Sequence, residues 1–342
     1  MKTHSALATN EKRVLYSGFR WDHHDEVSGY HHVVASSADY VDGGALWGGH
    51  SPIGSRSRRV NFLLIDVLTI VRSLRYRSVL LFYPEQTGYF SAPILRMLGK
   101  QVIYVVHLGE DYWLERDDSL FLKLKRFNLR FVSKFITLTQ QQKSVFDDHF
   151  PGKVARIPHG TWCRVRNNTG PSASDGKLHL TVVGDTYRDY ALLSRIIEFF
   201  LHHNPRVVFD LVGMKYEKLD ESQRAANVVC HGRLNSRQYQ EIIENSLFLL
   251  LPLKFATANN ALLEGLVAGV PVICSNTHGV REYLPPGDYV FDSIEDLALK
   301  VQRRSEMTQT ERAAEGDRLS SFVKENYSWD VIRNRVIDYC LV

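Results

Sequence analysis

The segment from residue 247 to residue 283 constrains the fold more than any other part of this chain. Residues 247–251 form an apolar run of strand length, and a polar loop follows them. A helix is expected from Asn259, because asparagine is a favoured N-cap, and it should end at Gly269, since Pro271 cannot continue a helix. A second apolar run, residues 270–274, follows at once. This order of strand, helix and strand predicts a parallel sheet that helices cover.

The same alternation runs through the rest of the chain and predicts an α/β fold with two doubly wound domains. In the first half we expect strands at residues 14–19, 33–36, 79–83, 102–107 and 135–139. Helical periodicity there covers residues 60–74, 92–98, 120–132 and 140–150. In the second half we expect strands at residues 178–183, 207–212, 228–230, 247–251, 270–274 and 289–291. Helices are expected at residues 192–202, 236–245 and 259–268 and from residue 294 onward.

Composition and turn residues set the expected domain limits. A chain of 342 residues, 44% of them apolar, suits two domains of ordinary size. Residues 39–59, rich in Gly, Ser and Arg, should form a long loop. Residues 166–177 are polar, contain Gly, Pro and Ser, and read as a linker. The expected organisation is a first domain, the linker, a second domain and a terminal segment, at residues 1–165, 166–177, 178–325 and 326–342.

The run NALLEGLVAGVPVI, from Asn260 to Ile273, resembles the donor-site motif of retaining GT-B glycosyltransferases of family four. That motif has two glutamates eight positions apart and then an Ala-x-Gly-x-Pro-Val turn. Glu264 matches the second glutamate, whereas Ala256 stands at the position of the first. The resemblance implies a GT-B fold, in which two Rossmann-like domains face a cleft. It also implies that the terminal segment, with Trp329 near its start, crosses back onto the first domain.

The helix that begins at Asn259 should lie at the donor site. The first N–H groups of such a helix point out of the carboxyl edge of a parallel sheet, where a diphosphate binds well. Asn259, Asn260 and Ala261 would hold phosphate oxygens, and Glu264 would accept hydrogen bonds from ribose hydroxyls. Lys254, at the end of the preceding strand, would neutralise the departing diphosphate. The alternative is an ordinary surface glutamate on an asparagine-capped helix.

Five further residues complete the expected site. Arg188 and Gly184 follow the first strand of the second domain, and Arg188 could grip phosphate bidentately. The resemblance places Arg233 beside the nucleotide base, Gly29 in a loop that faces the donor, and His107 near the transferred sugar. His107, Arg188 and Lys254 are the expected catalytic residues. A surface arginine, a plain turn and a packing histidine are the alternatives for Arg188, Gly29 and His107.

Charge and cysteine content limit the possible binding partners and the cellular compartment. The formal net charge of +4 is too small to indicate nucleic acid binding. The four cysteines form no CxxC pair, the N-terminus resembles no signal peptide, and no apolar run is long enough to cross a membrane, so a cytoplasmic protein is expected. The histidine pairs at residues 23–24 and 31–32 lack zinc-site spacing, and the resemblance implies that cationic side chains replace a metal.

The expected helix at residues 120–134 is basic and amphipathic. One face carries Lys123, Arg126 and Arg130, and another carries Leu120, Leu124, Phe127 and Phe131. One interpretation is a domain helix with a solvated cationic face. The other is a peripheral contact with the inner face of an anionic membrane, to which Arg56, Arg58 and Arg59 would contribute.

Together these features predict a metal-independent glycosyltransferase without a cofactor. It would move a sugar, with retention, from a UDP- or GDP-linked donor to a glycan or lipid-linked acceptor. Two alternatives remain open. One is a non-catalytic nucleotide-sugar-binding protein, suggested by Ala256. The other is a GT-B sugar-nucleotide epimerase, which would need converging acid and base carboxylates.

Overall fold

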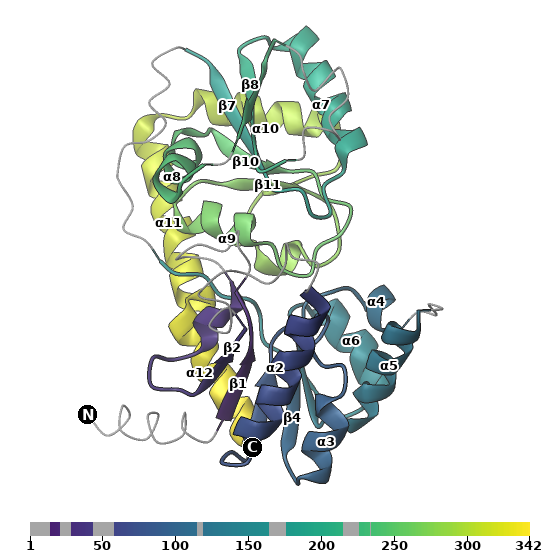
Figure 1. The fold of residues 1–342 in the computed structure, drawn as a ribbon. Helices are drawn as coiled ribbons and strands as arrows, with labels where there is room; N and C mark the ends of the chain where they lie inside the picture. Colours follow the sequence, from purple (N-terminus) through teal and green to yellow (C-terminus); the bar gives the residue numbers. More distant parts are fainter. Residues whose placement is uncertain are drawn as a thin grey trace, which may run out of the picture. The chain divides into compact units, whose positions relative to one another are not determined.

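The computed structural model of the chain confirms the expected α/β fold with two doubly wound units. It describes residues 14–20, 29–43, 58–114, 119–163, 176–214, 226–232 and 234–342. The chain divides into unit 1, Met1–Gly160 with Tyr327–Val342, and unit 2, Thr161–Asn326. Each unit contains a six-stranded sheet in which all neighbouring strands run parallel (Figure 1).

The sheet of unit 1 has the strand order β2-β1-β3-β4-β5-β6. These strands are β1 (Val14–Gly18), β2 (Tyr40–Asp42), β3 (Ser78–Leu81), β4 (Gln101–Val106), β5 (Lys134–Thr137) and β6 (Val154–Arg156). The helices are α2 (Arg58–Ser73), α3 (Ser91–Met97), α4 (Glu110–Leu114), α5 (Leu120–Asn128) and α6 (Gln140–His149), with short 3-10 turns η1 (Tyr30–Val33) and η4 (Leu129–Phe131). Because parallel crossovers are right-handed, α2, α3, α5 and α6 cover the same face of this sheet.

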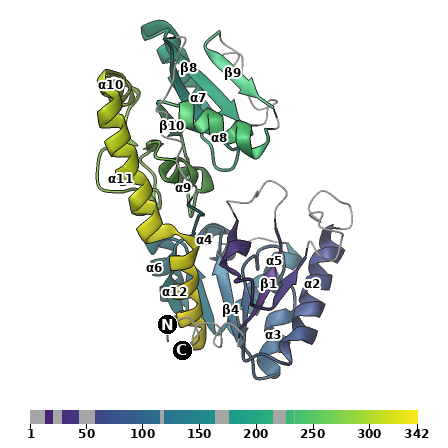
Figure 2. The ribbon, with the colours of Figure 1, turned by 90° about the vertical axis from the view of Figure 1, so that its left-hand side faces the viewer.

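The C-terminal helix α12 (Trp329–Leu341) packs on the opposite face of the unit 1 sheet from α2 (Figures 1 and 2). Trp329 is fully buried, and Gly160 lies so close that a Cβ atom there would stand 2.7 Å from the Trp329 ring. Arg333 donates hydrogen bonds to the carbonyl oxygens of His32 (2.9 Å) and Val33 (3.2 Å). The end of the chain is therefore part of the first unit.

The sheet of unit 2 has the strand order β12-β11-β10-β7-β8-β9. These strands are β7 (Leu178–Val183), β8 (Val207–Val212), β9 (Val228–His231), β10 (Phe248–Leu251), β11 (Val272–Ser275) and β12 (Val290–Phe291). The helices are α7 (Tyr190–His203), α8 (Ser236–Asn245), α9 (Asn260–Val267), α10 (Ile294–Glu306) and α11 (Gln309–Tyr327), with a 3-10 turn η7 (Arg281–Tyr283). Among the residues that the structure describes, no helix has the length and apolar character needed to span a bilayer.

One strand prediction in the first half is wrong. Residues 33–36 do not form a strand, because Val33 ends η1 and is buried where α12 packs against that turn. The strand that pairs with β1 is β2, which lies inside the predicted loop of residues 39–59. A three-residue strand is too short for its periodicity to be recognised in a sequence. Most of the predicted linker, residues 166–175, lies outside the described residues.

Gly265 allows α9 to pack closely on the sheet of unit 2, so Gly265→Ala should destabilise the protein. A Cβ atom at this position would lie 2.1 Å from Leu249 Cδ1 and 2.8 Å from Val272 Cγ2. Both neighbours are fully buried, so the cost should be about 1–3 kcal/mol. Urea unfolding followed by circular dichroism measures it. Gly232→Ala, where a Cβ atom meets nothing within 4 Å, is the matched control, and equal unfolding curves for the two variants would contradict the prediction.

Candidate nucleotide-sugar site

Two loops meet at the carboxyl edge of the unit 2 sheet. β7 and β10 are parallel neighbours, so the loops that follow them leave from the same edge. Arg188, after β7, forms an antiparallel bridge with Leu253, after β10. The Lys254 amide also donates a 3.0 Å hydrogen bond to the Tyr187 carbonyl oxygen. Three of the predicted residues, Gly184, Arg188 and Lys254, are thereby brought to one edge of the sheet.

The Arg188 side chain is buried and turned toward the carbonyl groups of its own loop. Nε donates to the Val183 carbonyl oxygen at 2.9 Å, and Nη2 donates to the same oxygen. Nη1 donates to the Thr186 carbonyl oxygen at 3.1 Å. Burial lowers the pKa of Arg188 to about 10, against the opposing influence of Cys274 and nearby phenol and carboxyl groups. The guanidinium therefore remains a cation at neutral pH, in a site of low polarity where its charge acts strongly.

The turn between β7 and Arg188 has an unusual backbone. Gly184 has φ 79°, which glycine adopts easily. Tyr187 has φ 57°, a left-handed conformation that is rare for a large side chain and costs about 1–3 kcal/mol. Its ring packs edge-on against Phe255 of the β10 loop, with 5.3 Å between centroids. Strain of this kind clusters at functional sites, but no propensity in the sequence marks Tyr187 or Phe255.

The β10 loop ends at a capped helix, as the sequence predicts. Asn259 is the N-cap of α9, and its side-chain oxygen accepts a 3.3 Å hydrogen bond from the Leu262 amide. Asn260 begins the helix, and Ala261 is buried in its first turn. Since α9 follows β10 directly, its positive N-terminal end lies at the same edge of the sheet as Lys254. The amides and dipole at such an end are suited to an anion.

Glu264 is joined to α8 by a short hydrogen bond. The Tyr239 hydroxyl donates to Glu264 Oε2 at 2.6 Å. Tyr239 also lies close enough to Arg188 to influence the pKa of that guanidinium. Tyr239 therefore lies near both Glu264 of α9 and the loop that follows β7. The sequence analysis did not include Tyr239, because its position on a separate helix gives no local signal.

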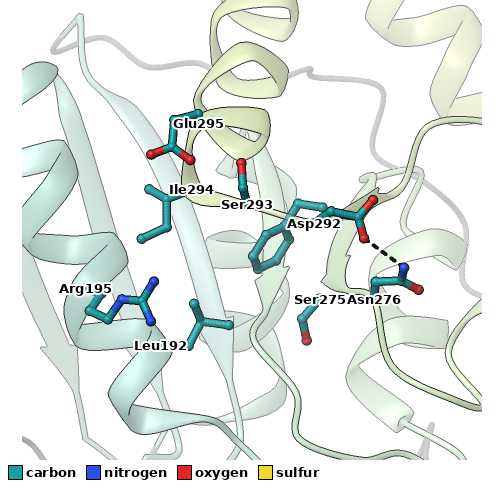
Figure 3. Close-up of a pocket in the computed structure, with 9 residues that line it drawn as sticks. Leu192, Arg195, Ser275, Asn276, Asp292, Ser293, Ile294 and Glu295 are labelled. Atoms are coloured by element: carbon teal, nitrogen blue, oxygen red, sulfur yellow. Dashed lines mark hydrogen bonds between the residues drawn. The ribbon is translucent and has the colours of Figure 1, made fainter.

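Ser275, at the end of β11, fixes the β10 loop from its other side. Its hydroxyl donates to the Leu253 carbonyl oxygen at 2.8 Å and accepts from the Leu253 amide at 2.7 Å. Beyond Ser275, a cavity of about 400 Å³ opens between α7 and the start of α10 (Figure 3). Asn276 donates a 2.7 Å hydrogen bond to Asp292 at its wall. None of the predicted site residues lines this cavity, which is separate from the candidate donor site.

His107 lies in unit 1, among aromatic rings at the end of β4. Its ring centroid is 4.6 Å from that of Tyr83 and 5.1 Å from that of Tyr30. Burial and the neighbouring His159 lower the pKa of His107 to about 3. The imidazole is therefore neutral at physiological pH.

Glu85, which the sequence analysis did not single out, holds the backbone next to His107. Its buried Oε1 accepts hydrogen bonds from the amides of His107 (2.7 Å) and Leu108 (3.1 Å). Burial raises the pKa of Glu85, while these amide hydrogen bonds oppose the shift. The available signal was a glutamate two residues past the predicted strand of residues 79–83.

Two further predictions concern loops of unit 1 and unit 2. Gly29 has φ 111° and is the N-cap of η1. The next residue, Tyr30, packs against His107, so Gly29 lies near His107 in the fold. Arg233 lies outside the described residues, as do His23, His24 and Arg56. No group of three or more histidine, cysteine or acidic side chains suited to a metal ion occurs in the described part of the chain.

A sequence comparison finds a family that resembles the second unit. Residues 177–306 match the family described as glycosyl transferases group 1. This match includes Arg188, Lys254 and the whole of α9. No curated protein has a sequence that matches the chain.

Solved structures identify the architecture of both units. Anabaena Alr3699/HepE, solved with UDP and glucose, is 13% identical with a TM-score of 0.64, over 96% of this chain and 98% of that one. An α,α-trehalose-phosphate synthase from Burkholderia vietnamiensis is 14% identical with a TM-score of 0.63, over 96% of this chain and 97% of that one. TarM of S. aureus, in a structure that contains UDP, is 14% identical with a TM-score of 0.63, over 80% of this chain. The chain spans only 58% of the TarM length.

These structures define the class: the chain has the GT-B fold of glycosyltransferases, as the sequence predicted. Within unit 2, residues 177–306 are similar to the family of glycosyl transferases group 1. At 13–14% identity the structural likeness extends to the fold alone.

His159 makes the stability of unit 1 depend on pH. Burial lowers its pKa to about 4, although its Nδ1 lies 2.7 Å from the Gly160 carbonyl oxygen. An unfolded histidine has a pKa near 6.5, so the unfolded chain binds the extra proton first and the native state loses stability as the pH falls. Between about pH 7.5 and pH 5, wild type should lose about 2 kcal/mol more than His159→Asn. Urea unfolding at both pH values measures this, and parallel losses in the two proteins would contradict it.

Proposed function

We propose that the chain is a glycosyltransferase that moves a sugar from a nucleotide-sugar donor to an acceptor hydroxyl with retention of configuration. The observation that carries this proposal is the convergence at one sheet edge of Arg188, Lys254 and the N-terminal end of α9, with Glu264 on the same helix. Positive groups and helix amides at one point suit a diphosphate. A carboxylate little more than one turn further along suits the adjoining ribose.

The donor is a nucleoside diphosphate sugar, and UDP is the favoured nucleotide, with GDP as the alternative. UDP is present in the structures of two proteins that share the fold, HepE and TarM. In this chain the phosphates would contact Lys254, the Arg188 loop and the first-turn amides of Asn260 and Ala261. Arg233, which follows β9, would lie beside the base, and no cofactor is required.

The difficult chemical step is the departure of the nucleoside diphosphate, because negative charge grows on its β-phosphate. Cations and amide dipoles fixed before the reaction stabilise that charge without reorganising. Arg188 is held rigidly by the carbonyl oxygens of Val183 and Thr186, which makes it such a preorganised charge. Lys254 is exposed and supplies a second, adaptable cation. These side chains and the α9 dipole would do the work for which other enzymes use a metal ion.

Unit 1 would supply the acceptor site, with a glycan or lipid-linked saccharide as the acceptor. His107 would then hydrogen-bond the transferred sugar as a neutral imidazole, and the Gly29 turn would approach the donor. Cys274 and Cys340 are buried as free thiols, which fits a reducing compartment, so we propose a cytoplasmic location.

A non-catalytic nucleotide-sugar-binding protein is the second candidate, and Ala256 is the observation that favours it. Ala256 is buried in the β10 loop, at the position where the resembling family has its first glutamate. Its methyl group cannot hydrogen-bond a donor sugar. Donor binding without turnover on any acceptor would support this candidate, whereas transfer or donor hydrolysis would exclude it. No observation on the described residues favours an epimerase.

Removal of the Glu264 carboxylate should weaken nucleotide binding without unfolding the protein. Hydrogen bonds to a charged group contribute about 1.5–3 kcal/mol, so Glu264→Ala should raise the Kd for UDP by about tenfold to a hundredfold. Isothermal calorimetry with UDP measures this change. Glu325→Ala, an exposed glutamate on α11, is the control and should bind UDP normally. Unchanged affinity in Glu264→Ala would refute the assigned role.

Removal of the Lys254 charge should slow departure of the leaving group more than it weakens donor binding. Removing one preorganised donor costs about 2.7–4 kcal/mol in the barrier, so Lys254→Ala should lower the turnover number by about 10²–10³-fold. Release of UDP from UDP-sugars, measured with and without acceptor, reports the rate. Lys324→Ala on α11 provides a matched exposed control. An unchanged rate in Lys254→Ala would exclude this lysine from the chemical step.

A further inference from the structure

Helix α5 buries polar side chains and exposes large apolar ones. Its buried side includes Lys125 and Asn128 beside Leu122, while Leu120, Phe121 and Phe127 are exposed. Leu120 exposes 79% of its surface and Phe127 exposes 49%. A surface helix normally buries its apolar side chains and presents its polar ones to water. This arrangement leaves large apolar side chains exposed among the described residues of this unit.

The buried polar residues of α5 fix this orientation. Lys125 Nζ donates to the Glu85 carbonyl oxygen and lies 4.3 Å from the centre of the Tyr89 ring. Asn128 Nδ2 donates to the carbonyl oxygens of Gly88 (3.0 Å) and Tyr89 (2.6 Å). Rotation of the helix would leave these buried groups unsatisfied, which is costly. The outward position of the apolar face is therefore a stable property of the fold.

Helix α2 carries an exposed apolar row as well. Its inner side buries Phe62, Ile65 and Thr69 against the sheet. Its outer side exposes large apolar residues at spacings of three and four, which places them in one stripe: Val60, Leu64, Val67, Val71 and, just past the helix, Leu74. A helix that is apolar on two sides can pack its outer side against a second apolar surface.

The two rows belong to one surface on the helical side of the unit 1 sheet. Arg59 of α2 lies over the Phe121 ring of α5, with Cζ 5.1 Å from the ring centre. Helix α3 packs against α2 and adds Met97, which is 78% exposed, and Leu98 at its end. We call the exposed apolar residues of α2, α3 and α5, with Leu74 and Leu98 just beyond α2 and α3, the apolar face. Exposed apolar residues gathered on one side of a unit in this way indicate a binding surface.

The exposed charges on α2, α3 and α5 themselves are all positive. Exposed cations on and between these helices are Arg59, Arg72, Arg75, Arg96, Lys123 and Arg130. Within residues 58–100 and 119–146 the only acidic residues are Asp66 and Glu85, and both are buried. Arg130 also lies over the Phe127 ring, at 5.6 Å, so cations and exposed aromatic rings are paired.

We propose that the apolar face docks on the surface of an anionic phospholipid bilayer. Apolar side chains that enter the acyl boundary, with arginine and lysine at the level of the phosphates, are the combination that such surfaces bind. A second copy of this chain fits less well, because apposed faces would bring together the exposed cations of α2, α3 and α5. The structure thus favours the membrane interpretation of residues 120–134 and extends it to α2 and α3. This inference concerns a surface of unit 1 and does not depend on the donor site.

Sedimentation of the full chain with vesicles tests the proposal in the absence of donor. We expect binding to vesicles of phosphatidylcholine with phosphatidylglycerol, weakened by salt, and little binding to phosphatidylcholine alone. Leu120→Ser combined with Phe121→Ser should lower the partition coefficient by about tenfold or more. Lys123→Glu combined with Arg130→Glu should lower it similarly on anionic vesicles.

Two control variants show whether the effect belongs to this face. Leu299→Ser changes an exposed leucine on α10, and Arg237→Glu reverses an exposed cation on α8; both should bind vesicles as wild type does. Equal partitioning onto neutral and anionic vesicles, or undiminished binding in the α5 variants, would overturn the proposal. So would light scattering that shows a wild-type dimer and a monomeric Leu120→Ser/Phe121→Ser variant. UDP binding by calorimetry is a separate readout, and its loss would leave the membrane result standing.

Discussion

The parallel pairing of β7 with β10 is the constraint on which the candidate site depends. Parallel neighbours end at the same edge of a sheet, so their following loops must meet there whatever their sequences are. In this chain the loops are also joined by the bridge between Arg188 and Leu253. A strained tyrosine on one loop packs against Phe255 on the other. The cations are therefore positioned by backbone hydrogen bonds, which are harder to lose than side-chain contacts.

This arrangement gives Arg188 two roles that need to be distinguished. Its guanidinium bonds to Val183 and Thr186 stabilise the loop, and its charge contributes to the field at the sheet edge. A substitution here removes both contributions, so a loss of activity would not separate them. Lys254 carries charge without supporting the loop through its side chain, which makes it the cleaner probe of electrostatic stabilisation. Ala256 is not among the proposed phosphate-binding elements. The alanine at this position therefore concerns contacts with the transferred sugar and not with the diphosphate.

The sequence predicted those features that local patterns encode. The N-cap at Asn259, the end of α9 near Gly269 and the strands around it follow from capping, glycine and proline rules, and the structure has all of them. The link from Tyr239 to Glu264 spans 25 positions, and no local rule reports it. Packing of the loop holds Tyr187 at a φ angle that the backbone of a tyrosine disfavours. Residues 33–36 show the same limit, because their apolar character serves packing against α12 instead of a strand ladder.

Helix α5 shows why amphipathicity alone does not reveal which side of a helix faces the core. The periodicity of residues 120–132 predicts a separate apolar side, yet that side is exposed here, and the buried side includes Leu122, Lys125 and Asn128. What decides the orientation is a set of acceptors: the carbonyl oxygens of Glu85, Gly88 and Tyr89 lie beneath the helix and need donors. Lys125 and Asn128 satisfy these acceptors, and buried polar groups of this kind are costly to leave unpaired. The apolar residues are consequently turned outward, where a surface with both acyl chains and phosphates would complement them and the surrounding arginines.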